Sequence, residues 1–461
     1  MDPSVAAVNE EVGEWAFGLT LNQVPKIVRL RHELVLADLL TVTAAGVALE
    51  EYQDLLRIWP LAQGRAPIPG TSYFSNTETA AWFFGATSVA LELDEGSKFA
   101  QGHPGSHVIP AILSLATELN APGESVQLAI IGGYEIAARA GSATRLNSGV
   151  HPHGNWGILG AAAGCALLLG LDGHGIACAM DHAAGSVLAT TFASALDGNL
   201  VRNSWMGSTA INAVISARMA QAGIAVNSGT AGQSLGKILG VFDPAEFSRG
   251  LGTSWEVERN YFKRHSACAF THPPIDATLQ LRSEMHAKML NQGGPEFADL
   301  ISTVESIEVS SHYLTLGLNG LRPSTRLAAM FSIPYVVAAA LIDGEVTPRQ
   351  HEASRLVSER LRELAAKVSV HHDEDLSRQL PDKRGARVVI SFQNGKKIFS
   401  EVAQPVGDSD FLPLGKSQLQ EKGENLMSPE TVMGFWTFAE SLSNCSDINQ
   451  LTYLFSNSHN K

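Results

Sequence analysis

The sequence predicts a mainly α-helical protein that carries a smaller α+β domain, and three observations support this fold class. From Val12 to about Val241, apolar residues recur at helical spacing and strand-like alternation is scarce. The pattern changes near Trp255, where strand-like and helical stretches begin to alternate. The final stretch, residues 428–455, returns to helical spacing. We therefore expect a helical body, a mixed domain at about 260–405, and a C-terminal part that packs back on the body.

The first part of the chain contains three long predicted helices, at residues 26–46, 123–141 and 175–196. They are rich in alanine and glycine, whose small side chains allow helix backbones to approach closely. The most apolar run, residues 157–171, is interrupted by glycines and is shorter than the ~18 residues that suggest a membrane span. We expect this run to be a buried helix in a tightly packed helical body.

The mixed domain has its own predicted elements. Residues 301–313 predict a strand, residues 326–344 a helix, and residues 386–402 a β-hairpin. The turn of the hairpin is Asn394-Gly395, a pair that tolerates the positive φ angles of a type I′ turn.

Charge and targeting features narrow the classes of function. The 461-residue chain has a formal net charge of -13 without long blocks of like charge, so it has no basic surface for nucleic acid or an anionic membrane. The N-terminal stretch carries acidic residues where an import segment needs lysine or arginine. We expect a cytoplasmic location, with a mitochondrial one as the alternative.

Four short stretches gather ionisable groups beside glycine or proline, where a scaffold exposes functional side chains. Three of them place histidines near a proline in a loop, which is typical of positioned acid–base residues. Such a collection suits the removal or delivery of a proton next to a carboxylate, with cations meeting the developing charge. The groups are Glu92, Asp94, Glu95, His103 and His107; His151 and His153; Asp197 and Arg202; and Lys263, Arg264, His265, Cys268 and His272.

Two other chemistries are weaker alternatives. His151 and His153, with His103 and an acid, could form a three-ligand metal site, but no H-E-x-x-H or paired-cysteine element accompanies them. The four cysteines lie far apart, which gives neither a disulfide framework nor a zinc or iron–sulfur pattern. No G-x-S-x-G elbow is present, and Cys268 lacks protease-type surroundings, so Cys268 is expected to line a pocket or the core.

Five stretches together resemble the MmgE/PrpD family, which holds 2-methylcitrate dehydratases, cis-aconitate decarboxylases and iminodisuccinate epimerases. The resemblance implies a helical domain at 1–258 and 406–461 with an α+β lid at 259–405, and an active site between them. It also implies a homodimer that uses neither a metal nor an organic cofactor. The stretches run in the order of the family: "LELDEG" with "HPGSHVIPAILSLA", "GYEIAARAG", "GVHPHGNWGILGAAAGCALLLGLD", "FKRHSACAFTHPPIDA" and "RPSTRLAAMFSIPYVVAAALIDGEVT".

The resemblance also implies residue roles. His103, His151 and Lys263 match catalytic positions. The predicted substrate-binding residues are Glu92, Arg202, Arg264 and Cys268. Glu92 replaces the leading aspartate of an acidic run, and Arg202 replaces a lysine, which keeps a cation but not a proton donor. Cys268 stands where cis-aconitate decarboxylases carry a histidine, which counts against that activity.

The predicted function is a metal-independent hydro-lyase that dehydrates 2-methylcitrate or a longer alkylcitrate to an aconitate-type alkene. One of His103 and His151 removes the proton α to a carboxylate, and the other, or Lys263, protonates the departing hydroxyl. A decarboxylase of a cis-aconitate-like acid is the alternative, followed by an epimerase of a dicarboxylate. A catalytically silent binding relative is the alternative outside the enzymes. No partner besides the polycarboxylate and a second copy of the chain is expected.

Overall fold

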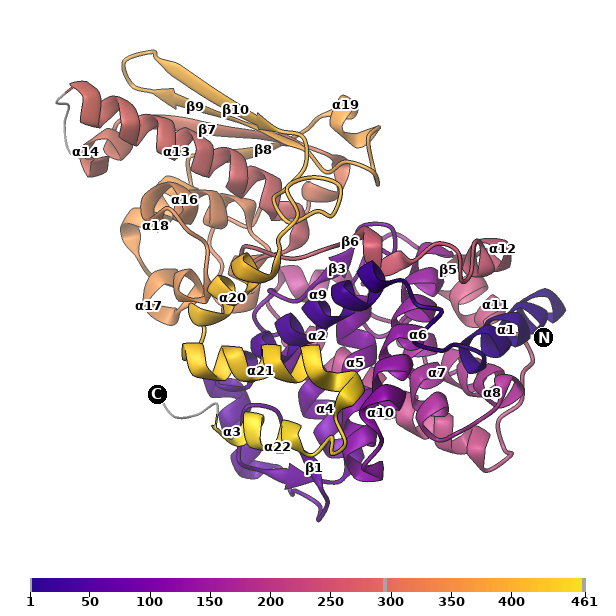
Figure 1. The fold of residues 1–461 in the computed structure, drawn as a ribbon. Helices are drawn as coiled ribbons and strands as arrows, with labels where there is room; N and C mark the ends of the chain where they lie inside the picture. The colour runs from indigo at the N-terminus through magenta and orange to yellow at the C-terminus, as the bar shows by residue number, and fades with distance from the viewer. Residues whose placement is uncertain (1, 293–296, 458–461) are drawn as a thin grey trace. The chain divides into compact units, whose positions relative to one another are not determined.

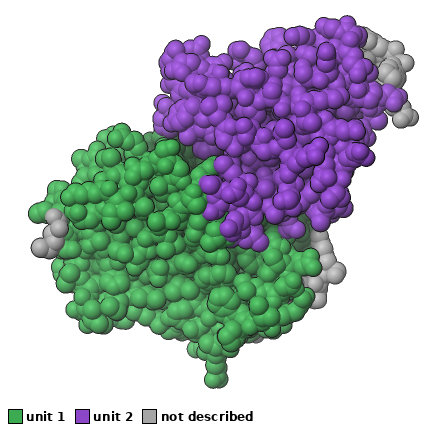
Figure 2. Space-filling model, turned by 180° about the vertical axis from the view of Figure 1, so that it is seen from behind, with its two compact units in different colours: residues 1–192, 201–261, 415–461 green, residues 193–200, 262–414 purple. Residues whose placement is uncertain are grey.

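The computed structural model describes residues 2–292 and 297–457, which fall into two compact units (Figure 1). Unit 1 comprises residues 1–192, 201–261 and 415–461, and unit 2 comprises residues 193–200 and 262–414 (Figure 2). This division differs from the predicted body and lid at the two boundaries and in the segment 193–200.

Unit 1 is built from helices, with three small antiparallel strand pairs. Its strands are β1 (Ala66–Pro67) with β2 (Phe74–Ser75), β3 (Gly96–Ser97) with β6 (Asn260–Tyr261), and β4 (Thr144–Leu146) with β5 (Gly240–Phe242). Its helices are α1 (Pro3–Phe17), α2 (Lys26–Val47), α3 (Glu50–Ile58), α4 (Thr77–Ser88), α5 (Pro104–Leu119), α6 (Gly123–Ser142), α7 (Ile158–Leu168), α8 (Gly173–Ala184), α10 (Val201–Gln221), α11 (Ala231–Gln233), α12 (Pro244–Ser248), α20 (Lys416–Glu424), α21 (Pro429–Ser441) and α22 (Gln450–Asn457).

The centre of unit 1 is the packing of α5, α6 and α7. A Cβ atom added at Gly160 of α7 would overlap the carbonyl oxygen of Gly133 in α6, so these two helices touch through their backbones. The close approach predicted from the glycine- and alanine-rich sequence is confirmed. Residues 158–166 of α7 are all buried, as expected for the most apolar run. Among the described residues no single helix is long and apolar enough to span a membrane, and α2 and α3 meet that test only as a pair bent by 72°.

Two of the three long helices of the body are confirmed, and the third prediction is wrong. The helices α2 and α6 end within a residue of the predicted bounds. The predicted helix at 175–196 instead ends at Ala184, and α9 (Phe192–Leu196) begins after a loop. The N–H of Leu188 in that loop donates to the carbonyl of Gly154 over 2.8 Å, so tertiary contacts hold the loop away from helical geometry. The C-terminal helix α21 packs against α2, as predicted.

Unit 2 contains a four-stranded mixed sheet in the order β10-β9-β7-β8, in which only β7 and β8 run parallel. Helix α13 lies along this sheet against β9 and β10 (Figure 1). The strands are β7 (Val304–Ser311), β8 (Val368–His372), β9 (Ala386–Phe392) and β10 (Lys397–Val402). The helices are α13 (His272–Gln292), α14 (Phe297–Ser302), α15 (Arg326–Met330), α16 (Ile333–Asp343), α17 (Ala353–Leu356), α18 (Glu359–Ala365) and α19 (Glu374–Ser377).

The predicted elements of the mixed domain are present, with two corrections. The strand at 304–311 and the hairpin β9–β10 are confirmed. The hairpin turn is not type I′, because Gly395 has a φ of 78° while Asn394 does not have a positive φ. The predicted helix at 326–344 is two helices, α15 and α16, because the Ser332 side chain accepts the N–H of Tyr335 over 3.0 Å and starts a new helix there.

Candidate active site

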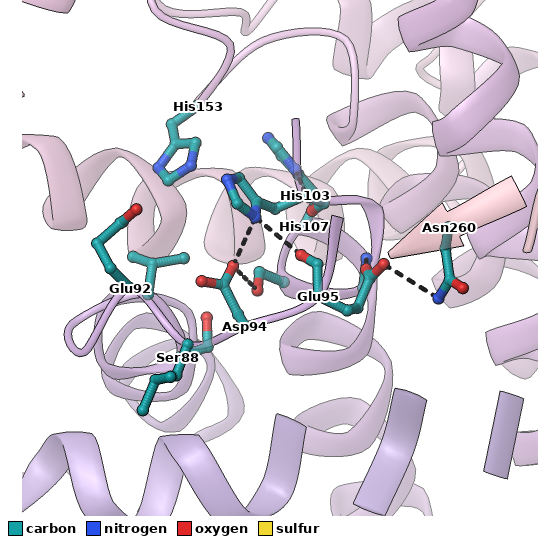
Figure 3. A network of polar contacts seen from close by, with 12 residues as sticks. Ser88, Glu92, Asp94, Glu95, His103, His107, His153 and Asn260 are labelled. Carbon is teal, nitrogen blue, oxygen red and sulfur yellow. Dashed lines mark hydrogen bonds and ion pairs between the residues drawn. The ribbon is translucent and has the colours of Figure 1, made fainter. Parts of the chain in front are cut away.

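His103 stands at the start of α5, where the chain leaves an irregular loop and enters the helix. Its Nδ1 lies 2.8 Å from the Glu95 carbonyl oxygen and 3.0 Å from Oδ2 of Asp94 (Figure 3). Both neighbours are hydrogen-bond acceptors, so this hydrogen-bond network assigns the proton of the neutral ring to Nδ1 and the lone pair to Nε2. A lone pair at Nε2 is the form that a general base needs.

Asp94 orients His103 and is itself held in place. Its Oδ2 accepts the hydroxyl of Ser106 over 2.8 Å, and the side chain is fully buried. A carboxylate beside an imidazole fixes the ring and stabilises the imidazolium form when the ring takes a proton. Sequence analysis placed Asp94 among the ionisable groups of "LELDEG" and named Glu92 as the site residue. The contact with His103 makes Asp94 a further candidate residue of the site.

The loop that carries Asp94 is conformationally unusual. Glu92 has a φ of 51° and Gln101 a φ of 55°, a left-handed region that residues other than glycine rarely adopt. Such backbone strain concentrates where a structure holds functional groups in a fixed geometry. The two strained residues flank the segment that supplies both acceptors of His103.

The side chain of Glu95 holds the loop that carries Asp94 through several hydrogen bonds. Its Oε1 accepts the N–H of Gly105 over 2.6 Å at the start of α5, and its Oε2 lies 3.1 Å from the hydroxyl of Tyr134. The amide nitrogen of Asn260 lies 3.5 Å from the same oxygen (Figure 3). Burial raises the pKa of Glu95 to about 8. Glu95 therefore holds its proton near neutral pH. Its side-chain hydrogen bonds also fix the position of its own backbone carbonyl, which orients His103.

His151 carries the opposite tautomer. The backbone N–H of His153 donates to Nδ1 of His151 over 3.1 Å, so the neutral ring keeps its proton on Nε2. The carbonyl of His151 is fixed by Asn155 Nδ2 at 2.7 Å and by Thr190 Oγ1 at 2.6 Å. One histidine thus offers a lone pair at Nε2, and the other offers a proton at Nε2.

The rings of the two predicted catalytic histidines both lie close to the ring of His153. The ring centroid of His153 is 5.1 Å from that of His103 and 4.5 Å from that of His151. Burial, helped by the charge of Arg202, lowers the pKa of His153 well below its usual value. Burial also lowers the pKa of His107 to about 4, and its Nδ1 donates to the carbonyl of His103 over 2.9 Å. His107 and His153 are therefore neutral near pH 7.

Glu92 and Arg202 form a buried ion pair. The guanidinium also donates from Nη1 to the Val89 carbonyl and to Oδ1 of Asn203, both over 3.1 Å. Its Nη2 lies 3.4 Å from Nε2 of His153. The structure thus brings Glu92, Arg202, His103 and His151 into one cluster, but the charge of Arg202 is largely offset by Glu92.

The other predicted residues belong to unit 2, and they gather in the chain between β6 and α13. Lys263 is fully buried, whereas Arg264 is exposed. Cys268 is a buried free thiol whose N–H donates to the Met330 carbonyl over 2.9 Å. Nearby, Nε2 of His265 lies 2.9 Å from Oδ1 of Asp276, which fixes the stretch that carries these residues.

The alternative three-ligand metal site does not form in the part of the chain that the structure describes. Within residues 2–292 and 297–457, no three histidine, cysteine, aspartate or glutamate side chains are placed to bind one ion. The rings of His103, His107 and His151 instead each meet the ring of His153, and the Nδ1 atoms of His103, His107 and His151 are engaged with the chain itself. The arrangement is suited to moving protons.

The fold and the site define a mainly helical protein with a mixed α/β unit and a buried histidine–carboxylate cluster of acid–base type. The chain belongs to the MmgE/PrpD family: its residues 10–249 match the N-terminal domain of that family, and its residues 265–432 match the C-terminal domain. The predicted family is therefore confirmed.

Three curated relatives illustrate the similarity. The chain is 25% identical over 439 residues to a cis-aconitate decarboxylase of Aspergillus terreus, which covers 88% of this chain and 87% of the relative. It is 24% identical over 495 residues to the cis-aconitate decarboxylase-like protein oryM of Aspergillus oryzae, with 97% of each covered. It is 23% identical over 374 residues to the cis-aconitate decarboxylase of Homo sapiens, with 76% of this chain and 74% of the relative covered.

Proposed function

We propose that this protein is a lyase that decarboxylates a cis-aconitate-like unsaturated tricarboxylate. The names of the relatives support decarboxylation over the dehydration predicted from sequence, and they outweigh the argument from Cys268. The main structural observation behind this proposal is that Nδ1 of His103 contacts Asp94 and Glu95. With Nδ1 engaged in this way, Nε2 is the ring nitrogen that can exchange a proton with the substrate.

In the proposed reaction, the bond between the substrate carbon and one carboxylate breaks and carbon dioxide leaves. The electron pair of that bond shifts through the adjacent double bond, and the carbon at the far end takes one proton. The imidazolium of His103 supplies this proton from Nε2, because Asp94 stabilises the charged ring beforehand. The net change is the loss of one carbon dioxide and the gain of one proton, which leaves a dicarboxylate.

His151 has a supporting role in this proposal. The proton on its Nε2 is suited to donate to a substrate oxygen on which negative charge develops. Lys263 remains a predicted catalytic residue, and Glu92, Arg202, Arg264 and Cys268 remain the predicted substrate-binding residues. Each of these assignments is a prediction that a single variant can test.

Dehydration of a citrate-like acid is the second candidate, and the same histidine supports it. In its neutral form, His103 has a lone pair at Nε2, which could remove a proton α to a carboxylate. His151 would then donate to the departing hydroxyl. The two candidates need opposite starting states of His103: decarboxylation needs the imidazolium, and dehydration needs the neutral ring.

Product analysis separates the candidates. The protein is incubated separately with cis-aconitate, 2-methylcitrate and a long-chain alkylcitrate in deuterium oxide, and the products are identified by mass spectrometry. Loss of carbon dioxide from cis-aconitate with one carbon-bound deuterium gained supports the decarboxylase. Loss of water from a citrate supports the dehydratase. Turnover of none of these acids, with His103→Gln behaving like the unaltered protein, contradicts both.

A further inference from the structure

Arg326 is the first residue of α15 in unit 2, and none of the described residues hydrogen-bonds to its Nε or Nη1. Both of these atoms are buried. Across the described ranges 2–292 and 297–457, no carboxylate forms an ion pair with it. The residue as a whole is half-buried.

An arginine in this state is unusual on energetic grounds. The guanidinium stays charged at every pH at which the protein is folded, so it cannot relieve its burial by losing a proton. Buried donors are nearly always paired, and an unpaired one calls for a water, an ion or a ligand. A planar guanidinium is the side chain that best fits a carboxylate, because it donates two parallel hydrogen bonds.

Among the described residues, none forms an ion pair with Arg326. His351 is the buried titratable side chain that senses the charge of Arg326, and its Nε2 donates to the Ser266 carbonyl over 2.6 Å. Burial lowers the pKa of His351 to about 4, so this ring is neutral near pH 7. Arg326 is therefore a net positive charge in a partly dehydrated place.

The position of Arg326 is fixed and lies next to the predicted substrate-binding stretch of unit 2. The Thr325 hydroxyl accepts the N–H of Ala328 over 3.2 Å, which holds the first turn of α15. The last residue of the same short helix, Met330, accepts the N–H of Cys268 over 2.9 Å. Arg326 therefore lies in the short helix whose last residue contacts Cys268.

We propose that Arg326 binds one carboxylate of the tricarboxylate substrate; this inference rests on the proposed function. Among the other predicted cations, Arg202 is paired with Glu92, and Arg264 is exposed to water, which weakens its electrostatic attraction. Arg326 adds a cation whose protein counter-ion is missing from the described residues. In this proposal Arg326 is a binding residue that makes the protein bind tricarboxylates more tightly than dicarboxylates.

The test measures binding, so it does not depend on turnover. Isothermal titration calorimetry compares tricarballylate with the two dicarboxylates that lack one of its carboxylates, glutarate and methylsuccinate. We expect Arg326→Gln to weaken tricarballylate binding by about 10- to 100-fold, the loss expected for a charged hydrogen-bonded pair. The preference for tricarballylate over at least one dicarboxylate should shrink by the same factor. Arg322→Gln, which removes an exposed arginine from the same stretch, is the matched control and should bind as the unaltered protein does.

Arg326→Lys guards against a folding defect, because it keeps the charge and loses only the paired donors; it should bind several-fold more weakly than arginine. Equal binding by Arg326→Gln and the unaltered protein overturns the proposal. Equal weakening by Arg322→Gln and Arg326→Gln, or no binding of any of the three acids by the unaltered protein, also overturns it. Selective weakening in a protein that turns over neither cis-aconitate nor a citrate supports Arg326 while the proposed function fails.

Discussion

Oδ2 of Asp94 lies 3.0 Å from Nδ1 of His103 and accepts the hydroxyl of Ser106 at the same time. This contact makes Asp94 a positioning residue, because it acts on the substrate only through His103. In Asp94→Asn the amide keeps the size of the side chain and loses the charge that stabilises the imidazolium. We expect kcat with cis-aconitate to fall by about 100-fold or more, with a much smaller change in KM.

The matched control for this variant is Asp299→Asn, which makes the same chemical change at an exposed aspartate of α14. It should leave kcat within about twofold of the unaltered protein, as expected for a surface residue away from reacting atoms. Circular dichroism spectra and thermal unfolding of both variants show whether the fold is retained. An Asp94→Asn enzyme with full kcat would mean that His103 does not need the carboxylate.

His103 and His151 should each be needed for turnover, whereas an exposed histidine should not. We expect His103→Gln and His151→Gln to lower kcat by about 100-fold or more, the usual size of an acid–base contribution. Tricarballylate should still bind to both variants, because these rings move protons rather than anchor the ligand. His174→Gln, at an exposed histidine of α8, is the control. Turnover that survives in either site variant would remove that histidine from the proposed chemistry.

The buried pair of Glu92 and Arg202 predicts a stability effect that depends on which charge is left behind. Arg202→Met leaves the Glu92 carboxylate buried without its cation, which should cost about 3–5 kcal/mol of unfolding free energy. The double variant Glu92→Gln/Arg202→Met should recover most of this loss. Arg57→Met, which breaks an exposed pair with Asp54, should cost about 1 kcal/mol or less. Urea unfolding that finds the double variant no more stable than Arg202→Met would show that the pair is not the cause.

Sequence periodicity predicted helices whose bounds are set by local sequence rather than by tertiary contacts. The helices α2 and α6 followed from apolar residues at helical spacing, and both are buried over long stretches, residues 35–44 and 129–141. The prediction of one helix at 175–196 was wrong because the chain after Ala184 is held by a hydrogen bond from Leu188 to Gly154. These two residues lie far apart in the sequence. A local pattern cannot report a tertiary contact of this kind.

The site was predictable as a set of histidine motifs and less so as a geometry. His103 and His151 stand out because each precedes a proline in a loop before a helix. The contact between Asp94 and His103 was not visible in the sequence, since the loop that carries Asp94 has a left-handed backbone at Glu92, which no spacing rule predicts. Arg326 was missed for a different reason: an unpaired guanidinium is defined by the partners that it lacks, and these appear only in the folded chain.

The raised pKa of Glu95 should make the unfolding free energy of the protein depend on pH. Its pKa rises from 4.5 to about 8 on burial, so between these values the folded chain keeps a proton that the unfolded chain has released. The unfolded state binds fewer protons in this window, and the contribution of Glu95 to the unfolding free energy therefore falls as pH rises. Glutamine at this position cannot ionise, and its oxygen can still accept the N–H of Gly105.

We therefore expect Glu95→Gln to gain stability over the unaltered protein as pH rises from 5.5 to 8, by about 1 kcal/mol per pH unit for one proton. Urea unfolding at several pH values measures this difference. Histidines whose pKa burial lowers, such as His107, shift stability in the opposite direction, but they are present in both proteins and cancel. Glu11→Gln, at an exposed glutamate of α1, should show no such trend. Parallel curves for Glu95→Gln and the unaltered protein would mean that Glu95 is ionised in the folded chain, and its hold on the start of α5 would then be that of a charged carboxylate.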